Sequence, residues 1–545
     1  MVCGQESCAE AIAARSWEVG TDFKEMAHNP DRKVLVIGLD VGDGKLIREW
    51  CRQEYLPNLN SLIANGTWGW LKTSAETLHV SGWPSLYTGT SPGKHGVYYT
   101  FQPAPGQVGF RRFGPSQYGS PFLWQLLSTK GKKCTIFDAP YVHPCDGLTG
   151  LQIFEWGTWA WYWKRMSIPR KLVHEMAHAC GPYPLEFEAN QIGLSAVDSS
   201  DLHRSLIEAA ASKAKCTRWL MKRAAWDFFC VVFGETHPAA HYFWPKETDS
   251  EVPGSGPHYQ FLRDVYVATD HAIGEILGSL DESVTVFIVS GDGVGPNHAG
   301  WHLLPEVLQR LGFTASRGSQ TEASDAEQPG QAKPGSRSLA RRMRDLIPAD
   351  FRSQITRHLP AHWRDAFYLR NSTANIDWSK TRAFCLPTDL EGCIRINLKG
   401  RDPHGVVEDG REYEEVCQKL AGALDKLINP RTGRPAVHQI LCARKIFSGE
   451  RRDYLPDMIV LWSNEAPISK VRSSEVGSVE VASPDQRTGT HHPPGFVIAR
   501  GPHVPKGWVL TGGDVVDFAP TVLAHFGIDG PHQMDGRPWQ EVIGN

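Results

Sequence analysis

A series of short apolar runs, each about as long as a β-strand, limits what this chain can fold into. The first, Val34–Leu39, is continuous and ends at an acidic residue, Asp40. Continuous apolar runs are typical of strands that are buried on both faces, and the long segments between these runs leave room for crossover helices. We therefore predict an α/β fold in which helices cover both faces of a large mixed or parallel sheet. The other runs are Cys134–Phe137, Phe228–Phe233, Val284–Val289, Met458–Leu461 and Phe496–Ala499.

The composition is that of a globular protein without a dominant charge. The 545 residues include 57 Lys and Arg against 60 Asp and Glu, which gives a net charge of −3. This balance argues against binding to a nucleic-acid polymer or to an anionic lipid surface. No run approaches the length of a membrane span, and residues 1–33 lack the apolar centre of a signal peptide. Since the twelve cysteines include no CxxC pair, we predict a soluble cytoplasmic protein with reduced thiols and no membrane contact. The sequence predicts no particular oligomeric state.

The chain is predicted to form one large α/β body with insertions. Thr314–Ser338 is rich in Ser, Gln, Gly, Pro and Ala, which is typical of a flexible linker or loop. Four tryptophans within Trp156–Trp163 precede two basic residues; this cluster either lines a substrate cleft or, as aromatic clusters more often do, packs in the core. The predicted parts are an N-terminal extension at 1–30, the first part of the core at 31–313 with an insert near 156–200, the linker at 314–338, and the second part of the core at 339–545 with a cap-like insert.

Side chains that can bind a metal or transfer a proton follow several of the predicted strands. In open α/β sheets, ligands bind beyond the carboxyl ends of the strands, where these residues would lie together. One His or Asp at a strand end is usually a helix cap or a surface group, but their coincidence at several ends favours a site. They are Asp40 after the first run, Glu235, His237 and His241 after the third, Asp292 after the fourth, and His491 and His492 before the last.

His237 and His241 are spaced to chelate one metal ion. If a helix begins near Pro238, which suits a first helical turn, two imidazoles four residues apart lie on the same side. His491 would complete a three-histidine site, with an open position for water or substrate as in catalytic zinc sites. We call these three residues the histidine trio. The alternative is that two of them face solvent and the third lies on a loop.

The segment from Glu76 to Gly96 carries the most specific pattern in the chain. It ends in Thr88-Gly-Thr-Ser-Pro-Gly-Lys-His-Gly96. The segment resembles the type I phosphodiesterase/nucleotide pyrophosphatase family of the alkaline phosphatase superfamily, in which a loop and helix start that carry the nucleophile run into Thr-Gly-x-x-Pro-x-x-His-Gly. The resemblance extends from Val34 to about Trp539 and implies an alkaline-phosphatase-like fold with insert and cap segments. Further stretches that share it are Val36–Asp40, Leu56–Leu59, Ala64–Thr67, Ile288–Ser290, Asp377–Ala383, Ile396–Arg401, Gly489–Gly495 and Ala519–Thr521.

The same resemblance implies that the catalytic centre departs from its family. The family holds two metal ions on carboxylates and imidazoles, and a Thr or Ser nucleophile begins a helix. In this chain the nucleophile position falls on His79, and the nearest hydroxyls are those of Thr77 and Ser81. Three ligand positions are changed and three are retained: His237 stands for Asp, Gly291-Asp292 stands for an Asp-His pair, and Asp40, His241 and His491 match.

These changes redistribute the expected metal ligands. The histidine trio is a neutral set that suits zinc, with iron, manganese, copper or nickel as alternatives. The second cluster, made of Asp40, His79 and Asp292, would hold an ion weakly or not at all, so we expect one or two ions per chain. His79 has three open roles, namely metal ligand, general base or a nucleophile that forms a phosphoimidazole, of which ligand or base is favoured. Ser81 is the best hydroxyl nucleophile if the loop shifts its register, although a helix-start Ser is more commonly a cap.

We predict a metal-dependent hydrolase that acts on a small phosphoester, phosphodiester or related oxyanion. The metal on the histidine trio would polarise the small anionic substrate, while Asp40, His79 and Asp292 form a weak second site or serve in acid/base catalysis. Two alternatives keep the fold: a single-metal lyase or redox enzyme of biosynthetic chemistry, and a pseudo-enzyme that binds a ligand without turnover.

Overall fold

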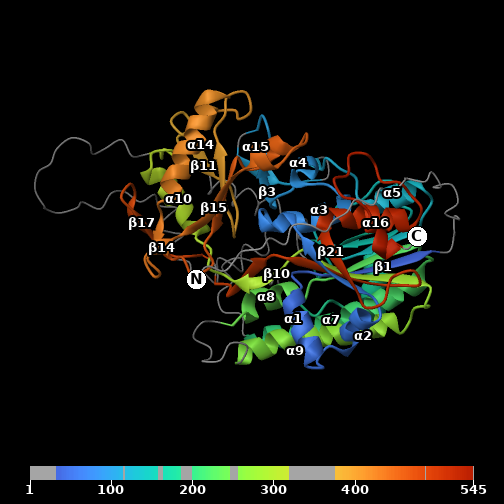
Figure 1. The fold of residues 1–545 in the computed structure, drawn as a ribbon. Helices are drawn as coiled ribbons and strands as arrows, with labels where there is room; N and C mark the ends of the chain where they lie inside the picture. Colours follow the sequence, from blue (N-terminus) through green and yellow to red (C-terminus); the bar gives the residue numbers. More distant parts are fainter. Residues whose placement is uncertain are drawn as a thin grey trace, which may run out of the picture.

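The computed structural model describes residues 32–107, 109–114, 117–157, 164–185, 199–245, 256–317, 375–484 and 486–543. The predicted N-terminal extension at 1–30, residues 318–338 of the predicted linker and residues 158–163 of the tryptophan-rich segment lie outside them. Within the described part, a large sheet lies between two layers of helices (Figure 1). A smaller lobe, made of residues 304–310 and 383–480, packs beside this main body (Figure 1).

Nine strands of the described chain form the large sheet. In order across the sheet they are β21 (Trp508–Asp514), β2 (Thr67–Lys72), β20 (Gly495–Arg500), β9 (Val284–Ser290), β1 (Lys33–Leu39), β8 (Phe228–Phe233), β5 (Cys134–Phe137), β6 (Gly150–Phe154) and β7 (Met166–Ile168). The centre is parallel, because β1 pairs in parallel with β8 and β9, and β5 pairs in parallel with β8. β20 is antiparallel to both of its neighbours, so the sheet is mixed. All but one of the predicted apolar runs are strands of this sheet.

Side chains of the central strand alternate between two apolar cores. Leu35, Ile37 and Leu39 enter one core, whereas Val34 and Val36 enter the other. This two-sided burial explains the uninterrupted apolar run. The first core is covered by α1 (Gly44–Arg52), α2 (Pro57–Ala64), α6 (Leu172–Cys180), α7 (Ser199–Arg223), α8 (Thr236–Phe243) and α9 (Pro257–Leu277), and the second by α3 (Gly82–Thr88), α5 (Leu123–Thr129), α16 (Phe518–His525) and α17 (Gln540–Ile543). Figure 1 shows α1, α2, α7 and α9 below the sheet and α3, α5 and α16 above it.

One predicted strand belongs to the smaller lobe and not to the large sheet. Met458–Leu461 lies in β16 (Met458–Trp462), which pairs antiparallel with its neighbours. The run is continuous because both faces are covered: Val460 packs in the core of the lobe, and Ile459 packs in a cluster with Leu78 of the main body. An apolar run therefore predicts that a strand is buried, but it does not predict which sheet the strand belongs to.

The smaller lobe contains two antiparallel sheets and the helices that cover them. The larger of these sheets has the order β11 (Ala383–Cys385), β12 (Gly392–Ile396), β16 and β15 (Val437–Cys442), and the other has the order β14 (Arg434–Pro435), β13 (Ile428–Asn429), β17 (Lys470–Ser473) and β18 (Gly477–Glu480). The helices are α10 (Leu304–Arg310), α14 (Arg411–Leu424) and α15 (Ala443–Ile446). In Figure 1 the lobe lies to the upper left of the main body, with α15 on the side nearer to α3.

The carboxyl ends of the parallel strands carry strained backbone and a short ribbon. Val41, Asp138 and Glu155 follow β1, β5 and β6, with φ values of 55°, 57° and 50°. The left-handed conformation is unfavourable for residues other than glycine, and the residues that adopt it are often found at functional sites. Beside these turns, β10 (Gly293–Pro296) pairs antiparallel with β19 (Gly489–His492). This is the edge of the sheet at which the sequence predicts a site.

Of the described helices, none combines the length and the hydropathy needed to cross a membrane. The ten cysteines in the described part of the chain are all free thiols, and eight of them are buried. Burial raises the pKa of the Cys230 thiol, on the central strand β8, to about 12. These cysteines therefore act as small apolar side chains.

Candidate metal centre

The structure brings the histidine trio together at the carboxyl edge of the sheet. His237 and His241 lie one turn apart on α8, and His491 lies on β19, which β10 holds in place. The donor atoms of the trio all lie within 4.8 Å of one another, and His237 Nε2 is 2.8 Å from His241 Nε2. Pro238 lies in the first turn of α8, where its missing N–H removes no helical hydrogen bond.

Each imidazole of the trio directs its Nδ1 atom at an oxygen acceptor. The acceptors are Asp40 Oδ2 for His237 at 3.0 Å, the Gly489 carbonyl for His241 at 2.8 Å, and Asp292 Oδ2 for His491 at 2.6 Å. Nδ1 is therefore the donor in each ring, and Nε2 keeps its lone pair. His237 Nε2 and His241 Nε2, which lie 2.8 Å apart, can share either a proton or a metal ion. Metal-binding histidines in proteins are held in this way.

The charge states of His241 and His491 also suit a metal. Burial lowers the pKa of His241 well below its ordinary value, and the neighbouring charges of Arg487 and His237 lower it further. Burial likewise lowers the pKa of His491 and outweighs the opposing effect of Asp292. Neutral imidazoles are ligands that zinc and other late divalent metals prefer. The donor set therefore fits an ion of this kind.

Asp40 supports the trio from the end of β1. Its Oδ1 accepts a hydrogen bond from Trp83 Nε1 at 2.7 Å, while its Oδ2 faces His237. Burial raises the pKa of this carboxyl, but the charge and hydrogen bond of His237 outweigh burial, and the pKa lies below its ordinary value. Asp292 is engaged in the same manner by His491. In the part of the chain that the structure describes, the trio is the only group of three or more such side chains placed to share an ion.

His79, at the nucleophile position of the resemblance, lies between two carboxylates. It begins the 3-10 helix η2 (His79–Ser81), with Nδ1 2.8 Å from Glu391 Oε2 and Nε2 3.0 Å from Asp389 Oδ1. Its backbone N–H also donates to Glu391 Oε1 at 2.6 Å. Burial lowers the pKa of His79, but the two carboxylates raise it to about 10. The ring is thus a cation at neutral pH, with both N–H groups engaged.

Arg487 joins the same loop of the smaller lobe to the trio. Its Nη2 lies 3.0 Å from Asp389 Oδ2, and its Nη1 lies 3.4 Å from His241 Nε2. When the three imidazoles are neutral, four carboxylates and two cations surround the trio, which leaves two negative charges in excess. The carboxylates are Asp40, Asp292, Asp389 and Glu391, and the cations are His79 and Arg487. A divalent ion on the trio would balance this excess, because buried charges are costly unless opposite charges compensate them.

Sequence reasoning did not find Asp389, Glu391, Arg487 or the supporting role of Trp83. Asp389 and Glu391 lie in the turn between β11 and β12, away from the strand ends of the large sheet. Arg487 lies just before β19. Acidic residues directly before the apolar strand β12 were the available signal, but nothing in the sequence places that turn beside α8 or η2.

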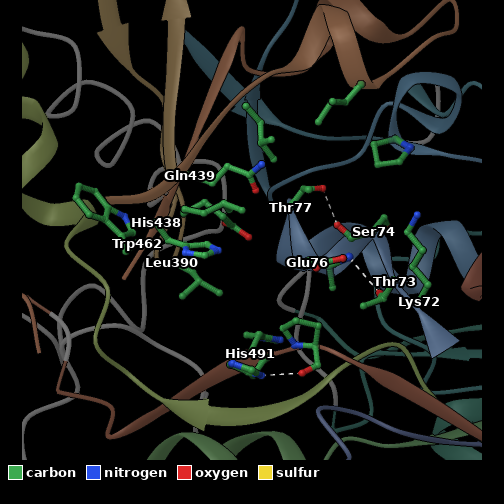
Figure 2. A pocket seen from close by; sticks show the side chains of 18 of the residues that line it. Lys72, Thr73, Ser74, Glu76, Thr77, Leu390, His438, Gln439, Trp462 and His491 are labelled. Atoms are coloured by element: carbon green, nitrogen blue, oxygen red, sulfur yellow. Dashed lines mark hydrogen bonds between the residues drawn. The ribbon is translucent and has the colours of Figure 1, made fainter. Parts of the chain in front are cut away.

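The hydroxyls nearest to the nucleophile position are engaged elsewhere. Ser81 Oγ is buried and donates to the Leu78 carbonyl at 2.6 Å. Thr77 Oγ1 donates to the Ser74 carbonyl at 3.0 Å, and Figure 2 shows these two residues turned towards each other. No hydrogen bond joins either hydroxyl to the trio within the described residues.

A cleft of about 880 Å³ opens beside the metal centre. It includes His491 and Glu391 and runs between the main body and the smaller lobe (Figure 2). One wall is polar and the other is mostly apolar, which suits a small ligand that is oriented by a few polar contacts. The polar wall contains Lys72, Thr73, Ser74, Glu76 and Thr77, and the apolar wall contains Leu390, Leu441, Ile446, Phe447, Leu461 and Trp462.

The sequence profile of the type I phosphodiesterase / nucleotide pyrophosphatase family matches residues 34–461. The chain belongs to this family. It is an enzyme of the phosphodiesterase/pyrophosphatase class of hydrolases, and the predicted resemblance is confirmed. The predicted α/β fold, with a large mixed sheet between helices, is confirmed as well. Family members typically depend on divalent metals, and the trio is a possible site for one in this chain.

Distant similarity to solved structures extends over most of the chain. Murine ectonucleotide pyrophosphatase/phosphodiesterase 5 is 13% identical, with 92% of this chain and 97% of that chain covered at a TM-score of 0.46. Phosphonoacetate hydrolase from Sinorhizobium meliloti in complex with phosphonoformate is 12% identical, with 90% and 94% covered at a TM-score of 0.44. Human ectonucleotide pyrophosphatase/phosphodiesterase 5 is 11% identical, with 93% and 97% covered at a TM-score of 0.45. Comparison with curated proteins found no significant match.

Proposed function

We propose that this hydrolase cleaves a small phosphoester, phosphodiester or related oxyanion with one divalent metal held by the Nε2 atoms of the histidine trio. The observation that carries the proposal is the arrangement of the three rings, in which every Nδ1 faces an oxygen acceptor and the donor atoms converge. Zinc is the first candidate, and iron, manganese, copper and nickel accept the same donors. Such an ion, when bound, supplies polarisation of a phosphoryl oxygen and a more acidic water molecule.

The residues around the trio hold its rings in the binding orientation. Asp40 and Asp292 fix the tautomers of His237 and His491, and Trp83 fixes Asp40 in turn. Because both carboxylates already serve these rings, we propose one ion per chain in place of the two that the family uses. The substrate is a small anion, which a metal-loaded centre with balanced buried charges can accept beside Arg487.

We assign His79 a positioning role in place of the three roles that its sequence position suggests. A cationic ring whose N–H groups both face carboxylates offers no lone pair to a metal, a proton or a phosphorus atom. Its two ion pairs instead tie the 389–391 turn of the smaller lobe to the main body. Ser81 is likewise assigned no catalytic role, because its buried hydroxyl is bonded to the Leu78 carbonyl. We further propose a cytoplasmic location, which the buried free thiols support.

The test is elemental analysis of the purified protein by plasma mass spectrometry, together with hydrolysis of bis(p-nitrophenyl) phosphate. We expect one metal ion per chain in the wild type and loss of both metal and activity in His237→Ala. His178→Ala is the matched control, because His178 is exposed on α6 and far in sequence from the site. His79→Gln should retain the metal, since His79 is not a ligand in this proposal, while its melting temperature falls because buried Glu391 loses its cationic partner and Asp389 keeps only Arg487.

Other results would contradict the proposal in specific ways. Two ions per chain would restore a two-metal centre and assign Asp40 and Asp292 as ligands. Loss of metal in His79→Gln with an unchanged melting temperature would return His79 to the ligand set. A metal-free wild type that still hydrolyses the ester would refute the trio as the catalytic metal site.

A further inference from the structure

A buried chain of hydrogen bonds ends at the cleft beside the metal centre. Ser85 Oγ on α3 lies 3.0 Å from His95 Nε2, and Ser74 Oγ lies 2.9 Å from Ser85 Oγ. His95 is the histidine of the Thr-Gly-x-x-Pro-x-x-His-Gly motif and ends the short helix α4 (Pro92–His95). His95 and Ser85 are completely buried, whereas Ser74 lines the cleft. The chain therefore connects a family motif residue to the space where a ligand would bind.

The direction of every proton in this chain follows from its buried end. The backbone N–H of Val97 donates to His95 Nδ1 at 3.0 Å, so Nδ1 carries a lone pair. Burial lowers the pKa of His95 to about 3, so the ring is neutral and its proton is on Nε2. His95 therefore donates to Ser85, and within the described residues Ser74 Oγ is the acceptor left for the Ser85 hydroxyl.

Ser74 is left as a donor that faces the cleft. Its Oγ accepts from Ser85, and within the described residues no other side chain or backbone group bonds to it. Its carbonyl is held by three donors, the N–H and hydroxyl of Thr77 and the N–H of Leu78, so the residue is fixed at the cleft wall. In Figure 2, Ser74 lies on the polar wall of the cleft that His491 also lines.

We propose that Ser74 is a specificity residue whose hydroxyl donates a hydrogen bond to an acceptor oxygen of the substrate, and that His95 sets its direction through Ser85. The acceptor belongs to the part of the substrate beyond the reacting phosphoryl group, such as a carbonyl, ether or sugar oxygen. The inference rests on the proposed function for the reacting group, but the proton order along His95, Ser85 and Ser74 stands without it. Ser74 would thus select among substrates and take no part in bond cleavage.

Calorimetric binding of two probes to the metal-loaded protein tests the proposal. Inorganic phosphate has no part beyond the phosphoryl group, whereas thymidine 5′-monophosphate carries sugar and carbonyl oxygens. We expect Ser74→Ala to weaken the binding of thymidine 5′-monophosphate about fivefold, the value of one neutral hydrogen bond, and to leave phosphate binding unchanged. The matched control is Ser463→Ala, because Ser463 lines the same cleft and its N–H bonds to the Ala436 carbonyl. Ser85→Ala removes the link to His95 without touching the cleft, and a smaller loss for the nucleotide is expected.

A second measurement examines the proton order without any ligand. Nitrogen-15 spectra of histidine-labelled protein should show His95 as a neutral ring protonated at Nε2, assigned by its absence in a His95→Gln variant. A His95 ring protonated at Nδ1 or on both nitrogens would overturn the directed chain. Equal weakening of both probes in Ser74→Ala, no weakening of either, or failure of the wild type to bind thymidine 5′-monophosphate would overturn the specificity role. Normal binding without hydrolysis would instead count against the proposed function alone.

Discussion

Replacement of Asp292 by asparagine should reduce the metal affinity of the trio without removing a ligand. Asp292 is buried, and its Oδ2 lies 2.6 Å from His491 Nδ1, the shortest of the three contacts that hold the trio. Loss of such an outer partner lowers metal affinity about 10- to 100-fold. Charge-assisted hydrogen bonds are about twice as strong as neutral ones, so an amide at this short contact should give the upper part of that range. Asp40→Asn should give a loss at least as large, because the single oxygen of an amide cannot accept from both Trp83 Nε1 and His237 Nδ1.

The assay is competition for zinc with a chromophoric chelator, with stoichiometry checked by plasma mass spectrometry. Asp453→Asn is the control, because Asp453 is exposed and lies outside the metal centre. Thermal unfolding of each metal-free variant verifies that it is folded. A metal affinity of Asp292→Asn within about twofold of the wild type would refute the reasoning, since outer partners of metal-binding histidines normally matter more than that. An effect of Asp40→Asn clearly smaller than that of Asp292→Asn would refute the assignment of both Asp40 oxygens as acceptors.

Two further predictions concern the packing and the charges around the centre. Gly489→Ala should abolish metal binding, because a Cβ at this position would lie 2.1 Å from the Ala240 carbonyl oxygen and push β19, with His491, away from α8. The control is Gly422→Ala, where a Cβ meets nothing within 4 Å, and it should leave the metal content unchanged. Asp457→Asn should destabilise the fold by about 3 kcal/mol at pH 7, because buried Arg401 loses the more buried of its two carboxylate partners and keeps only Asp402. Burial raises the pKa of Asp457 but Arg401 lowers it more, so the pKa lies below its ordinary value; the stability it contributes is present above about pH 4 and is lost below that, and the gap between variant and wild type in thermal unfolding should close towards pH 3. A gap that stays constant from pH 7 to pH 3 would contradict this assignment, as would full metal occupancy in Gly489→Ala.

The sequence predicts the central sheet well because burial on both faces leaves a direct trace. β5 and β8 have the bounds that their apolar runs predict, and α8 begins where the spacing of His237 and His241 requires it. The trio could be found for the same reason: strand ends and a helical repeat of four bring its members together by local geometry. The same reasoning assigned Met458–Leu461 to the wrong sheet. Both faces of β16 are buried, but the apolar run does not show which elements bury them.

The ion pairs around the trio could not be predicted from sequence. Asp389 and Glu391 reach His79 across more than 300 positions of the chain, from a turn of a different sheet. From the sequence alone, His79 is therefore predicted to be a reactive group at a nucleophile position. Its actual contacts depend on how the smaller lobe packs on the main body. Arg487 has the same status, because its two partners, Asp389 and His241, lie on separate parts of the fold.

The charged turn at 389–391 also determines how a ligand can reach the cleft. Asp389 and Glu391 connect the smaller lobe to His79 and Arg487 through contacts of 2.6–3.0 Å. A hinge motion that lifted the lobe would separate these ions, so we expect substrate and product to exchange through the open cleft without movement of the lobe. The lobe and the metal centre therefore depend on each other. A chimaera with a different lobe on this body would leave His79 and Arg487 without their carboxylate partners unless both residues were replaced as well.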